Sequence, residues 1–120
     1  MNETFGALLA TWQAERATDA RVRGTMQRIA ADETRHAALA WEILGWGITL
    51  LSPAERSRVL AALDRALSAL EAAPYPAVAA IVRDVAGYPE REHERRLARE
   101  FSTFARAEAA FFALPHAPAS

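Results

Sequence analysis

Residues 29–37 read Ile-Ala-Ala-Asp-Glu-Thr-Arg-His-Ala, and this stretch decides the fold that we expect. On both sides of it, apolar and small residues recur in alternating steps of four and three. That spacing predicts one long helix over residues 20–50 with an inward-facing seam. Glu33 and His36 belong to this seam, because side chains three residues apart are neighbours on a helix. The complete seam is Val22, Met26, Ile29, Glu33, His36, Ala40, Ile43 and Gly47.

The rest of the chain also favours helix. A first helix is predicted over residues 2–17, and Asp19 is placed to cap the helix that follows. Ser52-Pro53-Ala54-Glu55 has the pattern of a capping box and starts a third helix that runs to about residue 73. Shorter and longer helices follow over 77–86 and 89–114, with a break at Gly87. We therefore predict an all-α fold with a single domain over 1–114, made of a helical hairpin (1–51) and additional helices (52–114), and a flexible tail over 115–120.

Composition limits the classes of function. The 120 residues include no Cys, which excludes disulfides, thiolate metal sites and cysteine nucleophiles. The net charge is -1 and no basic stripe stands out, so we expect no nucleic-acid partner. We expect neither a signal peptide nor a membrane span, because the residues given show no basic region followed by an apolar run at their start and no apolar run of membrane-spanning length. The expectation is a cytoplasmic protein with no membrane partner.

Glu3 is the third candidate residue of the site. If the first two helices form an antiparallel hairpin, two residues at the same height are equally far in sequence from the turn. The mean of their residue numbers is then the position of the turn. For Glu3 and Glu33 this midpoint is position 18, which lies in the predicted turn at Thr18-Asp19. A stripe of small residues on the first helix (Ala7, Ala10, Ala14 and Ala17) allows the two helices to approach closely. The hairpin therefore predicts that Glu3, Glu33 and His36 lie at similar heights, where carboxylate and imidazole groups suit iron, manganese or zinc.

This pattern resembles the second half of a ferritin-like, rubrerythrin-type di-iron carboxylate domain. In that family one helix of each pair supplies a Glu and the other supplies Glu-x-x-His. The resemblance covers residues 1 to about 50 and implies that Glu3 is a bridging or terminal ligand. It further implies that Glu33 is the bridging carboxylate, that His36 is the terminal imidazole, and that the metal is iron or manganese.

The sequence departs from the family in one respect. The family uses four helices and two half-sites, whereas this chain offers one half-site. A second copy of the chain, related by a twofold axis, would supply the other half as a homodimer, and missing N-terminal helices would do the same. A second Glu-x-x-His, at Glu90 and His93, has charged neighbours all round, and we interpret it as a solvated helix start.

Three functions therefore stay open. The first is a metal-binding ferritin-like protein of di-iron or di-manganese type. The second is a helical structural or interaction module with a vestigial metal site. The third is a truncated fragment of a longer ferritin-like protein. The sequence assigns no reaction and no catalytic residue to any of them.

Overall fold

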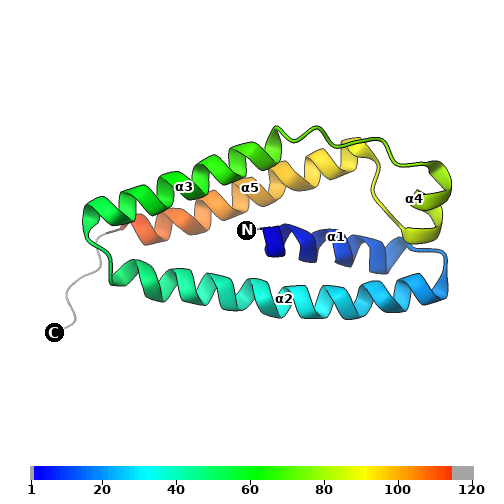
Figure 1. The fold of residues 1–120 in the computed structure, drawn as a ribbon, viewed down its shortest axis with the longest axis horizontal. Helices are drawn as coiled ribbons and strands as arrows, with labels where there is room; N and C mark the ends of the chain where they lie inside the picture. Colours follow the sequence, from blue (N-terminus) through cyan, green and yellow to red (C-terminus); the bar gives the residue numbers. More distant parts are fainter. Residues whose placement is uncertain (1, 115–120) are drawn as a thin grey trace.

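The computed structural model describes residues 2–114, and over these residues it contains helices and no strand (Figure 1). The all-α prediction is confirmed. The predicted tail over 115–120 lies outside the described residues. No helix among the described residues is both long and apolar enough to cross a membrane. The helices are α1 (Asn2–Arg16), α2 (Ala20–Thr49), α3 (Pro53–Glu71), α4 (Ala80–Ala86) and α5 (Arg91–Ala113).

Two helix starts follow from local side-chain chemistry. The carboxylate of Asp19 accepts hydrogen bonds from the N–H groups of Arg21 and Val22, at 2.9 and 3.0 Å, and so caps α2. Ser52 and Glu55 form both bonds of a capping box at the start of α3, with Pro53 in the first turn. Both caps use residues that are close in sequence, which is why the sequence predicts them correctly.

Helices α1 and α2 run antiparallel and side by side, joined by a short turn (Figure 1). This is the arrangement that the midpoint at position 18 predicted. Ala7, Ala10 and Ala14 of α1 are buried, and their small side chains let the two helices lie close together. The start of α1 lies beside the middle of α2, so the second half of α2 extends past the hairpin partner (Figure 1).

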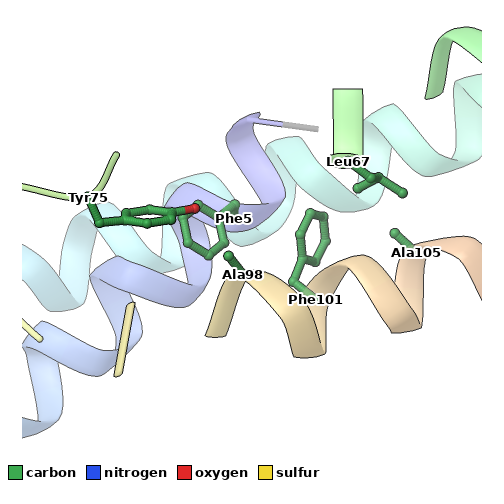
Figure 2. Close-up of a cluster of buried hydrophobic side chains, with 6 residues drawn as sticks. All are labelled: Phe5, Leu67, Tyr75, Ala98, Phe101 and Ala105. Carbon is green, nitrogen blue, oxygen red and sulfur yellow. The ribbon is translucent and has the colours of Figure 1, made fainter. Parts of the chain in front are cut away.

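The apolar core lies between this hairpin and the pair formed by α3 and α5 (Figure 2). Phe5 of α1 reaches Phe101 of α5, with 6.1 Å between the ring centroids. Arg106 of α5 also links this helix to α3, because its guanidinium group donates hydrogen bonds to Asp64 at 2.8 Å and to Glu71. The buried members of the core are Phe5, Leu67, Tyr75, Ala98, Phe101 and Ala105.

The predicted seam of α2 is not its buried face in the described chain. The buried residues of α2 are Ala37 and Ile48, neither of which belongs to the seam. The seam residues are half-buried or exposed, with Ile29 40% and Ile43 55% exposed. The inward orientation was therefore wrong for this chain alone. The physical reason is that α1 packs on the neighbouring face of α2, which carries Ala37, so the seam lies at the edge of this contact.

The cross-section of the molecule shows the same openness. The two smaller principal extents are 27 and 15 Å. A closed square bundle of four helices spaced 8–10 Å apart would measure about 15 Å in both directions, counted at the Cα atoms. The helices thus form an elongated arrangement rather than a closed four-helix bundle (Figure 1).

Candidate metal centre

Glu33 and His36 lie next to each other in the middle of α2. The helix is continuous through both residues, so their spacing of three places them on one face. Glu33 is half-buried and His36 is exposed. Neither side chain has a hydrogen-bond or ion-pair partner among the described residues. Both side chains are therefore available to a ligand.

Glu3 lies in the first turn of α1, where a carboxylate interacts favourably with the positive end of the helix dipole. Its side chain is exposed. The neighbouring residue Thr4 lines a cavity together with Thr34 and Ala37 of α2, so the start of α1 lies beside the middle of α2 (Figure 1). The start of α1 thus presents its carboxylate to solvent, as α2 does with its imidazole.

The described chain does not gather these residues into a closed cluster. Across residues 2–114, no group of three or more His, Cys, Asp or Glu side chains is placed to hold a metal ion. The assignment of Glu3, Glu33 and His36 as metal ligands stays a prediction. Chemically, two carboxylates and one imidazole supply half of the donors that a di-metal carboxylate site requires.

Large apolar side chains surround the pair on the same helix. Beyond the seam, the outer side of α2 carries three further exposed residues, which are Leu39, Trp46 and Leu50. Trp46 is 67% exposed, which is unusual for so large an apolar side chain. Exposed apolar residues scattered singly are normal, but a stripe of them along one helix is typical of a contact surface.

The second Glu-x-x-His does not provide a free pair of ligands. Glu90 accepts a hydrogen bond from Arg83 at 2.7 Å, and the His93 ring lies tilted against Trp12 with 5.5 Å between the ring centroids. The guanidinium group of Arg16 lies over the Trp12 ring, 3.5 Å from the ring centroid. These partners argue against a ligand role for Glu90 and His93, although His93 is half-buried beside Trp12 and not solvated as we expected.

Sequence reasoning missed one polar residue in this region. We expected the start of α5 to be charged and solvated all round, but Glu94 is buried, with 5% of its surface exposed. Its carboxylate accepts a hydrogen bond from the Tyr88 hydroxyl at 2.8 Å. Helical spacing could have revealed this burial. Glu94 lies four residues before Ala98, on the side of α5 that also carries the buried residues Phe101 and Ala105.

This contact predicts a dependence of stability on alkaline pH. Burial and the hydrogen bond to Glu94 raise the pKa of Tyr88 to about 12. Between the ordinary tyrosine pKa of about 10 and that value, the unfolded chain loses the proton while the folded chain retains it. The free energy of unfolding should therefore decrease as pH rises through this window.

Replacing Tyr88 with Phe tests the contact. The variant should show a shallower loss of stability from about pH 10 to 12, and it should lose about 1–3 kcal/mol at pH 7 because Glu94 is left buried without its donor. Urea unfolding followed by circular dichroism, at neutral pH and across the alkaline range, measures both effects. An unchanged slope together with unchanged stability at pH 7 would show that the contact has no energetic weight.

Comparison with known proteins gives no further assignment. No family model matches the chain, and neither a curated protein nor a solved structure matches it.

Proposed function

We propose that this protein is a ferritin-like metal-binding protein in which Glu3, Glu33 and His36 form one half of a di-iron or di-manganese site. A second copy of the chain supplies the other half, and the functional unit is a homodimer. Carboxylate oxygens and an imidazole nitrogen are suitable ligands for both kinds of ion, so these three residues would hold the metal. Bound metal would supply Lewis-acid or redox chemistry at this site.

The observation that carries the proposal is the exposed edge of the α2 seam. Glu33 and His36 stand at its centre, and Ile29 and Ile43 lie exposed on either side. An apolar stripe of this length seldom stays in contact with water in a folded protein. A helix that covers it with hydrocarbon alone would leave a carboxylate and an imidazole without partners, which is unfavourable. A second hairpin covers the stripe and brings matching ligands.

The order of residues along the seam suits an antiparallel pair. With a twofold axis passing between Thr34 and Arg35, Glu33 lies level with the partner's His36, and Ile29 lies level with the partner's Ala40. Continuing outward, the matched positions are Met26 with the partner's Ile43 and Val22 with the partner's Gly47. Two of these three apolar pairs place a large side chain opposite a small one. Such pairing lets side chains interdigitate at close helix spacing.

Metal and dimer would stabilise each other. Each chain alone offers an open half-site, and the assembled pair binds the ions more strongly than either half. Ions that bind only the dimer shift the equilibrium toward it by mass action. The proposal therefore predicts association that depends on metal, rather than a permanently associated pair.

A crosslinking experiment tests the antiparallel register. Ile29→Cys and Ala40→Cys are made in separate chains, which is clean because the protein has no native Cys. In the proposed dimer, residue 29 faces residue 40 of the other copy at about 8–10 Å, whereas two copies of the same residue lie about 16 Å apart along the axis. The metal-free variants are mixed, loaded with Mn²⁺ and treated with a short bis-maleimide. Crosslinked dimer should form in the mixture and be scarce in either variant alone.

The same experiment separates the alternatives. Equal crosslinking in the mixture and in the single variants would contradict the register, and no crosslinking in any sample would contradict the dimer. The exposed outer residues Leu39, Trp46 and Leu50 favour a second candidate function, an interaction module with a vestigial site. Crosslinking in the mixture that is independent of Mn²⁺ would favour this module over the metal-binding protein.

A further inference from the structure

A polar cleft lies beside the first half of α5, away from the candidate metal ligands. Helix α3 ends at Glu71, and the chain then continues without regular structure to Ala79, so α3 does not cover this part of α5. The cleft has a volume of about 550 Å³, and Ala77 and Val78 form one wall. Its charged lining consists of Arg83, Glu90, Arg91, Glu92, Arg95 and Arg99.

The arginines of α5 are placed in a way that the fold alone does not explain. Arg91, Arg95 and Arg99 follow one another at intervals of four, so they form a short basic stripe on one flank of the helix, which we did not identify from the sequence. Like charges at this spacing destabilise a helix. Among the described residues, none of the three forms an ion pair or a side-chain hydrogen bond with a carboxylate. Arg83 already pairs with Glu90 at 2.7 Å. Among the described lining residues, Glu92 is therefore the one acidic group left to balance the charge of three unpaired guanidinium groups.

Two residues of the lining also carry backbone donors without a partner in the part of the chain that the structure describes. The backbone N–H groups of Ala77 and Val78 donate to no other group among the described residues. A guanidinium group presents a planar set of N–H donors that matches pairs of oxygens on phosphate. Successive arginines four residues apart lie about 6 Å apart along the helix, so a ligand with two or three linked anionic groups would contact more than one of them.

We propose that this cleft binds a small polyvalent oxyanion of the phosphoanhydride class. Arg91, Arg95 and Arg99 hold its anionic groups, and the site is separate from Glu3, Glu33 and His36. Binding is electrostatic and bidentate, so it weakens with added salt and discriminates against monovalent anions.

Isothermal titration of the metal-free protein with inorganic triphosphate at low salt tests the site. The wild type should bind saturably, and Arg95→Ala/Arg99→Ala should bind at least about tenfold more weakly, because two charge-assisted contacts are lost. Arg58→Ala/Arg65→Ala on α3 is the matched control, since it removes the same charge from exposed residues outside the cleft. The control should stay within about twofold of the wild type. Arg95→Gln/Arg99→Gln, checked by circular dichroism, serves if the alanine variant does not fold.

Three results would overturn the proposal. The first is a wild type that does not saturate with triphosphate. The second is equal weakening of binding by both double variants, which would indicate an effect of net charge alone. Sedimentation with vesicles containing phosphatidic acid provides the third arm. Vesicle binding without triphosphate binding would assign the arginines to a lipid surface instead of a small anion.

Discussion

Replacing Gly87 with Ala should reduce the free energy of unfolding by about 3 kcal/mol or more, which is a large fraction of the stability of a small domain. Gly87 ends α4 with a φ of 63°, a conformation that disfavours any residue with a Cβ. An added Cβ would also lie 2.4 Å from the backbone nitrogen of Ala17 and 2.8 Å from the carbonyl oxygen of Gln13. Backbone atoms cannot rotate away, so the junction itself would have to move.

This junction attaches α4 to the turn of the α1–α2 hairpin. The amide of Thr18 donates to the carbonyl oxygen of Asp84 at 3.1 Å, and the side chain of Gln13 donates to that of Ala86 at 3.0 Å. Gly24→Ala on α2 is the matched control, because a Cβ added at Gly24 meets no atom within 4 Å beyond the backbone of its own helix. That control should gain up to about 1 kcal/mol from the better helix propensity of Ala. Urea unfolding of both variants measures the difference, and a Gly87→Ala variant as stable as the wild type would contradict the close approach.

Gly87 also illustrates what sequence can and cannot reveal. A glycine after an apolar helical stretch predicts a helix end, and the structure has one. The caps at Asp19 and Ser52 are equally local and equally predictable. The approach of Gly87 to Ala17 joins residues far apart in the chain, and no local pattern encodes it.

The seam of α2 shows the same limit at the level of a whole helix. The spacing of its apolar residues identifies a face that suits another helix, but it does not say which helix covers that face. In the described chain the buried residues of α2 are Ala37 and Ile48 instead, and the seam with Glu33 and His36 is half-buried or exposed. Glu94 was missed because its neighbours in sequence are charged, although its helical spacing places it on the same side of α5 as the buried residues.

The second large effect concerns metal retention. Glu33→Gln and His36→Gln should each weaken Mn²⁺ or Fe²⁺ binding by at least about a hundredfold, since even residues that only support ligands cost 10–100-fold. Glu42→Gln is the control, because Glu42 is exposed on the same helix and is not part of the seam. Elemental analysis after anaerobic loading and desalting gives the metal content of each variant. Retention that is equal in all three variants would show that the metal binds elsewhere.

The same variants should leave the metal-free protein intact. Glu33 is half-buried and His36 is exposed, and neither has a hydrogen-bond partner among the described residues. Their replacement by Gln should therefore change the free energy of unfolding by no more than about 0.5 kcal/mol. A much larger loss would assign these residues a structural role, in place of the role of ligands.

The central claim is that a second copy completes the site on the open face of α2. Sedimentation equilibrium of the wild type, with metal content determined on the same samples, tests it most directly. After loading with Mn²⁺ and desalting, the protein should sediment as a dimer with about one ion per chain, and chelation should shift it toward monomer. A chain that stays monomeric with and without Mn²⁺ or Fe²⁺, and retains no metal after desalting, would contradict the account.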